Sequence, residues 1–271
     1  MKPLFHLIGL PTDCNSSFER GAALAPSAIR AALWSDRGNL ACENGMEVGI
    51  DFRIDDRGDL LLDESSQDDT RILGEVTSCH VDGATPLLLG GDHAVTFPIM
   101  QAIHAYYGPV TILHFDAHPD LYDDFCGNPR SHASPFARIM ESGLASRLVQ
   151  VGIRTLNSHC REQAARFGVE IIGMRGFTAD LVPQLDCPTY ISLDLDGIDP
   201  AFAPGVSHAE PGGLTVREVL AVLDRVKGPI VGADVVELNP RFDVNSVTAI
   251  LAAKFVREIA SRAASNREKS L

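Results

Sequence analysis

The chain has 271 residues, with 23 Lys and Arg against 36 Asp and Glu, so its formal net charge is −13. This acidic balance argues against a nucleic-acid partner or an anionic membrane surface and is compatible with a cationic substrate. No apolar run approaches the roughly 18 residues of a membrane span, and the first residues are too polar for a secretory signal. The six cysteines form no C-x-x-C pair, which is typical of reduced thiols. We therefore expect a cytoplasmic enzyme.

Seven short runs rich in Val, Ile and Leu are expected to be strands. They are apolar almost throughout rather than alternating, which is typical of strands covered on both faces in a parallel sheet. In chain order the runs are Leu4–Leu10, Pro86–Leu89, Val110–Phe115, Leu148–Ile153, Val169–Ile172, Thr189–Leu193 and Ile230–Val236.

The segments between these runs resemble helices. Residues 68–81 place apolar side chains on one helical face, Thr215 and Glu218 form a capping box ahead of an apolar run, and residues 246–264 make a closing helix. The acidic stretch 55–69 is interpreted as a solvated linker rather than a cation site. Repeated strand–helix units predict an α/β fold with helices on both sides of a parallel sheet, and we interpret residues 1–271 as one domain.

Polar side chains follow four of the expected strands, at the edge where open α/β sheets bind ligands. His93 comes after the turn Gly90-Gly91-Asp92. Asp116, His118 and Asp120 are spaced by two, so an extended backbone points all three to one side. Their convergence beside a buried strand is costly unless a cation neutralises the carboxylates.

The other two strand ends carry further carboxylates. Asp194 and Asp196 share one face, whereas Asp199, before a proline, is interpreted as a structural turn residue. Glu237 ends the last strand at the same edge. The loop before His132 brings that histidine within reach of the edge, where it would carry a proton between the site and solvent.

Together these residues predict a dinuclear metal site. Oxygen-rich ligands with some imidazole and no thiolate suit Mn²⁺ or its neighbours better than structural Zn²⁺. Four carboxylates balance two divalent cations, and a water bridging them would become a nucleophile near neutral pH. A free carboxylate at Glu237 would repel a phosphate ester but hold a guanidinium by a bidentate pair. The six proposed ligands are His93, Asp116, His118, Asp120, Asp194 and Asp196.

These motifs resemble those of the ureohydrolase family of arginases and agmatinases. Gly-Gly-Asp-His, Asp-Ala-His-x-Asp and Ser-x-Asp-x-Asp-x-x-Asp-Pro appear here at residues 90–93, 116–120 and 192–200, and the likeness covers nearly the whole chain. Segments 131–141, 201–214 and 232–241 are most similar to plant-type arginases. The resemblance implies a three-layer α/β/α sandwich with a mainly parallel sheet, two Mn²⁺ per subunit (with Ni²⁺ or Co²⁺ as alternatives), and a homotrimer or homohexamer.

The resemblance also assigns roles to the site residues. His93, Asp116, Asp120 and Asp194 would hold one ion. Asp116, His118, Asp194 and Asp196 would hold the other, so that Asp116 and Asp194 bridge. Glu237 would pair with the substrate guanidinium, His132 would supply a proton to the leaving amine, and Asp120 would orient the attacking hydroxide.

The far end of the substrate is less well defined by the motifs. The candidate contacts there are Tyr122, Asn128, Arg130, Asn157 and His208. Arg130 either meets a substrate carboxylate, which favours arginine over agmatine, or is a solvated loop charge.

The resulting hypothesis is a manganese guanidino hydrolase that releases urea from arginine, with agmatine as the alternative substrate. Guanidinobutyrate, formiminoglutamate and guanidine are rival substrates in the same fold class. Two more distant hypotheses are a metal-dependent amidohydrolase and a metal-binding paralogue without activity. Both are disfavoured because Glu237, His132 and all six ligands are present.

Overall fold

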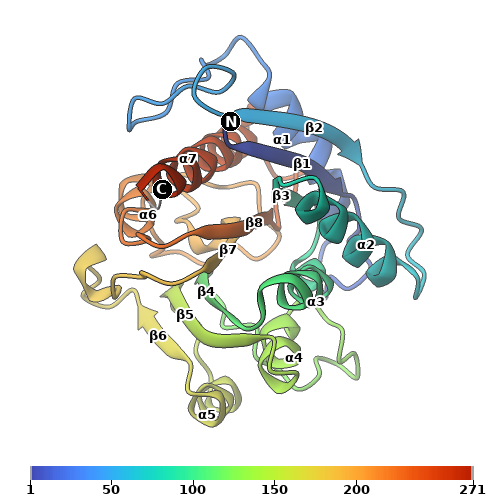
Figure 1. Ribbon diagram of the computed structural model, residues 1–271. Coiled ribbons are helices and arrows are strands. Elements are labelled where there is room, and N and C mark those ends of the chain that lie inside the picture. Colours follow the sequence, from blue (N-terminus) through green and yellow to red (C-terminus); the bar gives the residue numbers. More distant parts are fainter. Residues whose placement is uncertain (1, 270–271) are drawn as a thin grey trace.

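An eight-stranded sheet, parallel at every pairing, runs through the centre of the computed structural model, which describes residues 2–269. The strand order is β2-β1-β3-β8-β7-β4-β5-β6 (Figure 1). The strands are β1 (Leu4–Leu10), β2 (Arg53–Asp59), β3 (Thr85–Gly90), β4 (Val110–Phe115), β5 (Ala145–Ile153), β6 (Glu170–Gly173), β7 (Thr189–Asp194) and β8 (Ile230–Val236).

Seven of these strands confirm the expected runs, and β2 is the one that the sequence interpretation missed. Its sequence, Arg-Ile-Asp-Asp-Arg-Gly-Asp, has no apolar pattern because β2 is an edge strand that pairs only with β1 and is largely exposed. Arg30 forms ion pairs with Asp56 and Asp59 of this strand. The interpretation of residues 55–69 as a linker was therefore wrong for its first part, where backbone pairing rather than side-chain burial makes the strand.

Helices cover both faces of the sheet, which confirms the three-layer α/β/α architecture (Figure 1). On one face α1, α6 and α7 share a hydrophobic core with the strands, and on the other α2 to α5 share a second core. The helices are α1 (Ala25–Leu33), α2 (Asp68–Val81), α3 (Thr96–Tyr107), α4 (Pro135–Glu141), α5 (Ser158–Phe167), α6 (Val216–Leu223) and α7 (Val247–Lys269).

Local sequence signals explain several helix boundaries. The helix expected over residues 68–81 is confirmed as α2. The Thr215 side chain accepts from the Glu218 N–H and the Glu218 side chain accepts from the Thr215 N–H, which confirms the capping box at the start of α6. The closing helix begins at Val247 and runs to Lys269, beyond the expected end at residue 264. All six cysteines are free.

The four adjacent central strands β3, β8, β7 and β4 place the site. Parallel pairing aligns their carboxyl ends at one edge, so residues far apart in the sequence meet there. Within residues 2–269, the structure contains no helix with the length and apolar character of a membrane span.

Candidate metal centre and substrate pocket

The His93 imidazole lies at the centre of the first ligand group. It follows β3 after a turn at Gly91, where a Cβ atom would come within 1.7 Å of the Thr12 carbonyl oxygen, so only glycine fits. His93 Nδ1 lies 3.3 Å from Asp116 Oδ2, 3.1 Å from Asp120 Oδ2 and 3.2 Å from Asp194 Oδ2. This buried nitrogen has no hydrogen-bond partner.

The spacing of these four atoms fits a divalent cation. Ligand atoms held at right angles about 2.1 Å from an octahedral ion lie about 3 Å from one another. A buried nitrogen without a partner, facing three carboxylate oxygens at this spacing, is the geometry that a bound ion would complete. The donor set therefore fits the metal that the sequence predicts.

A second group of ligand atoms adjoins the first. His118 Nδ1 lies 3.0 Å from Asp196 Oδ2 and 3.3 Å from Asp116 Oδ1. Asp116, His118 and Asp196 form a cluster able to hold a metal ion, with all ligand atoms within 4.8 Å of one another. The two oxygens of Asp116 thus face different histidines, as expected of a carboxylate shared between two ions.

The electrostatics of the cluster favour cation binding. Burial, together with the charges of Asp196 and Asp116, raises the pKa of Asp194 well above its usual value. Burial and the Asp116 charge also raise the pKa of Asp196 to about 7. Without a cation these buried carboxylates repel one another, and a divalent ion would relieve that cost.

A chain of hydrogen bonds to Nε2, the ring nitrogen that does not face the carboxylates, orients His93. Three hydroxyl groups, on Thr96, Tyr190 and Ser192, donate to the buried carboxylate of Asp234 at 2.7–2.9 Å. Because the Ser192 proton is used in this way, its oxygen accepts from His93 Nε2 at 2.9 Å. The proton on Nε2 leaves Nδ1 free to face the carboxylates.

A cavity of about 180 Å³ opens over the ligands. Its walls include His118, Asp120, Asp194 and Asp196 from the metal cluster and four other predicted residues, which are Tyr122, His132, His208 and Glu237. The sequence interpretation missed Ser17 and Phe125, which also line the cavity. Both lie outside the helices and strands, where no repeating sequence pattern predicts the direction of a side chain, so their position becomes clear only from the structure.

Glu237 and His132 form a buried pair beside the cluster. His132 Nδ1 lies 2.8 Å from Glu237 Oε1, which also accepts from the His93 backbone N–H at 2.8 Å. The other ring nitrogen of His132 lies 2.8 Å from the Ser17 hydroxyl oxygen. Burial alone would lower the pKa of His132, but the Glu237 carboxylate, together with the charges of Asp120 and Asp92, outweighs it and raises that pKa to about 9. The carboxylate that the sequence assigns to the substrate therefore faces a cationic partner.

Two of these acids have unusual backbone conformations. Asp120 has φ 49° and Glu237 has φ 64°, both in the left-handed region that residues other than glycine rarely adopt. Such strain persists only where surrounding contacts hold it, and it often marks functional sites. Here it turns each carboxylate toward the cavity.

Of the remaining residues predicted to contact the substrate, some line the cavity and others lie outside it. His208 lies in the cavity, with its ring centroid 5.3 Å from that of His132. Asn157 caps α5 through Cys160 N and donates to the Tyr122 hydroxyl at 2.5 Å, so it lies behind a cavity residue. Asn128 donates to the Asn15 side chain.

Arg130 lies away from the cavity. It donates to both oxygens of Asp69 at 2.8 Å, stacks over Phe97 and lines a separate cavity. Asp199 accepts from three backbone N–H groups, at residues 201, 212 and 213, which confirms its role as a turn residue.

Known proteins are similar to this chain in sequence and in fold. The chain is 47% identical to Arginase 1, mitochondrial, of Arabidopsis thaliana, over 94% of this chain and 80% of that protein. It is 35% identical to Agmatinase, mitochondrial, of Gallus gallus, over 93% of this chain and 78% of that protein. The solved arginase from Medicago truncatula superposes with a TM-score of 0.90 at 43% identity, covering 96% of this chain and 87% of that one.

These relatives correct the expected location. Both curated relatives carry the word mitochondrial in their names, so the expectation of a cytoplasmic enzyme was wrong. The expectation rested on composition and cysteine usage. Organelle import depends instead on targeting segments that are removed from the mature protein, so the composition of a folded domain does not report it.

The match extends over the whole catalytic fold. The sequence profile of the arginase family fits residues 4–261, from β1 through most of α7. This span contains all six proposed ligands, Glu237 and His132. The chain therefore belongs to the arginase family.

Proposed function

We propose that the chain is an arginase, which hydrolyses L-arginine to ornithine and urea at a centre of two Mn²⁺ ions. The observation that carries this proposal is the buried Glu237 carboxylate, which stands beside the ligand cluster and is paired with His132. A carboxylate in this position binds a planar cation and repels an anionic ester. The relatives named arginase support arginine as the substrate.

The ligand set supports manganese as the native metal. Four carboxylates and two imidazoles form an oxygen-rich site without thiolate, which suits Mn²⁺, with Ni²⁺ or Co²⁺ as alternatives. When bound, the two ions would lower the pKa of a water and so supply a nucleophile near neutral pH. His93 and Asp120 would hold one ion, His118 and Asp196 would hold the other, and Asp116 and Asp194 would be shared by both.

The protein groups around the cluster would place and protonate the substrate. Glu237 would exchange its pairing with His132 for a bidentate pair with the guanidinium, which aims the guanidinium carbon at the metal cluster. His132, released from Glu237 and close to the Ser17 hydroxyl, would then deliver a proton to the leaving amine. Asp120, which lines the cavity, would orient the attacking water and stabilise the charge that develops on the substrate.

The aliphatic chain and α-groups of arginine would extend toward the mouth of the cavity. Tyr122 and His208, which line the cavity, would contact this part of the substrate, and Asn157 holds the Tyr122 hydroxyl. Agmatine lacks the α-carboxylate and is the alternative substrate, favoured by the relative named agmatinase. We further propose that the subunits assemble as a homotrimer or homohexamer.

A substrate panel tests this assignment. The Mn²⁺-loaded protein is incubated with arginine, agmatine, guanidinobutyrate and guanidine, and both urea and the amine product are measured. We expect urea and ornithine from arginine, with kcat/KM at least tenfold above that for any other compound. A preference for agmatine would make the protein an agmatinase, and urea from none of them would contradict a ureohydrolase function.

A further inference from the structure

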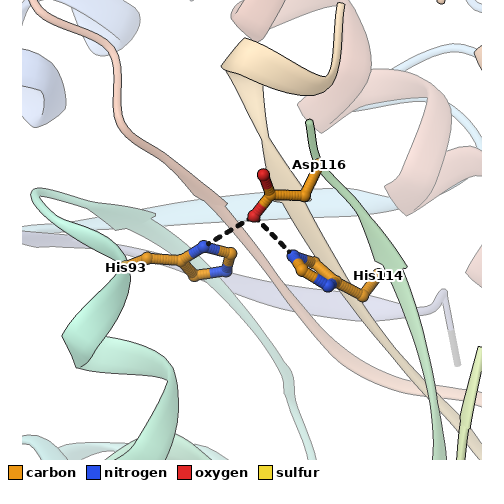
Figure 2. Close-up of side chains that lie close together, drawn as sticks. All are labelled: His93, His114 and Asp116. Carbon is orange, nitrogen blue, oxygen red and sulfur yellow. Dashed lines mark hydrogen bonds and ion pairs between the residues drawn. The ribbon is translucent and has the colours of Figure 1, made fainter. Parts of the chain in front are cut away.

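His114 is a buried histidine beside the ligand cluster that the predicted ligand set does not include. Figure 2 shows it facing the same Asp116 oxygen as His93, and the three residues form a group able to hold a metal ion. His114 is therefore either a further metal ligand or a group that holds Asp116 in place. The state of its two ring nitrogens decides between these roles.

The Gln150 side chain fixes one of these nitrogens. Gln150 lies on β5 directly opposite His114 on β4, and neither residue is exposed to solvent. Gln150 Nε2 donates to the Pro119 carbonyl oxygen at 2.6 Å. A carbonyl only accepts hydrogen bonds, so the NH₂ end of this amide, and not its oxygen, must face Pro119.

The same NH₂ group lies 3.0 Å from His114 Nδ1. Both amide protons are then in use, one at Pro119 and one at His114, and Nδ1 must accept. The ring carries its proton on Nε2, which donates to Asp116 Oδ2 at 2.9 Å. Neither ring nitrogen is left with a free lone pair for a metal ion.

We propose that Gln150 is a positioning residue of the metal centre, which acts through His114 on the shared carboxylate of Asp116 and through Pro119 on the segment that carries His118 and Asp120. The inference deepens the proposed function, on which it rests for the identity of the metal. Its second contact explains how a segment without regular structure is held: Pro119 directly precedes Asp120, whose backbone is strained. Partners of this kind orient ligands, and their loss typically weakens metal affinity 10–100-fold.

The proposal is tested by two measurements that need no substrate. The first is NMR of ¹⁵N-histidine-labelled, metal-free protein, in which the two nitrogen shifts of His114 report its protonation. We expect a neutral ring with the proton on Nε2. A proton on Nδ1 in the wild-type protein would overturn the proposal whether or not any variant folds.

The second measurement compares Mn²⁺ binding by calorimetry in Gln150→Met and Gln163→Met. Gln163 is the matched control because it is also buried and donates to the carbonyl of Leu121 in the same segment, without touching His114. We expect Mn²⁺ affinity to fall about 10–100-fold in Gln150→Met and to change less than about threefold in Gln163→Met.

Equal loss in both variants, or none in Gln150→Met, would contradict a role through His114. The two proposals fail separately. If Gln150→Met loses Mn²⁺ while the wild-type protein releases no urea from arginine, the inference stands and the proposed function does not.

Discussion

The ligand cluster and the mouth of the substrate cavity are built in different ways. His93, Asp116 and Asp194 stand at the ends of central strands whose parallel pairing fixes where each side chain emerges. Tyr122 and His208, which line the cavity, sit on connecting segments. Tyr122 is held by a hydrogen bond from Asn157, and His208 by a ring contact with His132. The comparison teaches that sheet register specifies the chemistry, whereas contacts between loops specify the shape of the pocket.

The largest effect is expected at the shared carboxylate of the cluster. Asp116→Asn keeps the shape of the side chain but removes the charge that faces both His93 and His118. Loss of an orienting partner costs up to about 100-fold in metal affinity, so loss of a shared ligand should cost at least that much and abolish urea release. Metal content after gel filtration measures this, and a variant that retains both ions would refute the sharing.

Glu237→Gln should lower activity while leaving the metal in place. It removes the charge that pairs with the guanidinium, and losing one such charge-assisted contact in an active site typically costs about 10²–10³ in rate. Steady-state kinetics with arginine measures the loss. Loss of bound Mn²⁺ in this variant would show instead that Glu237 is a metal ligand.

The same pair predicts a pH effect in the metal-free protein. Burial lowers the pKa of His132, but Glu237, with Asp120 and Asp92, outweighs burial and raises that pKa to about 9, above the ordinary value of 6.5. Because the folded-state pKa is raised, the pair stabilises the fold fully below pH 6.5, and this contribution is lost as the pH rises through about 9.

In Glu237→Gln the burial of His132 is opposed only by the charges of Asp120 and Asp92, so the pKa of His132 should fall toward its ordinary value. Histidine NMR titration of both proteins measures the shift. An unchanged His132 pKa in the variant would mean that another group holds the proton.

The smallest effect is expected at Arg130, outside the cavity. Arg130→Met removes a partly exposed ion pair with Asp69, which is worth about 1 kcal/mol or less. We expect the ratio of kcat/KM for arginine to that for agmatine to change less than about threefold. A selective rise in KM for arginine would show that Arg130 binds the substrate carboxylate and would contradict its placement outside the substrate cavity.

The sequence predicted every strand of the sheet except β2, which lies at one edge. The six central strands were recognisable because buried parallel strands are apolar throughout. Of the two edge strands, β6 was recognisable from Val169 and Ile171, which pack against a hydrophobic core, whereas β2 was hidden because it carries Arg and Asp. The six proposed ligands were found from their places at strand ends, and the structure brings them together.

Other contacts of the site could not be predicted from any pattern in the sequence. Three side-chain contacts of the site each join residues more than 30 positions apart in the sequence. They are Glu237–His132, Ser17–His132 and Gln150–His114. Such contacts depend on the relative placement of strands and loops in three dimensions, and no local spacing encodes them. The far-end contacts Arg130 and Asn128 were proposed from proximity in sequence to His132, yet neither lines the cavity.

The central claim is that two metal ions held by this cluster drive hydrolysis of arginine. The direct measurement is a titration of metal-free protein with Mn²⁺ in which urea release from arginine is followed against bound metal per chain. We predict no activity without metal and a rate that rises to a plateau at about two bound ions per chain, as expected of a two-metal site. Full activity at one bound ion per chain, or urea release from the metal-free protein, would contradict the account.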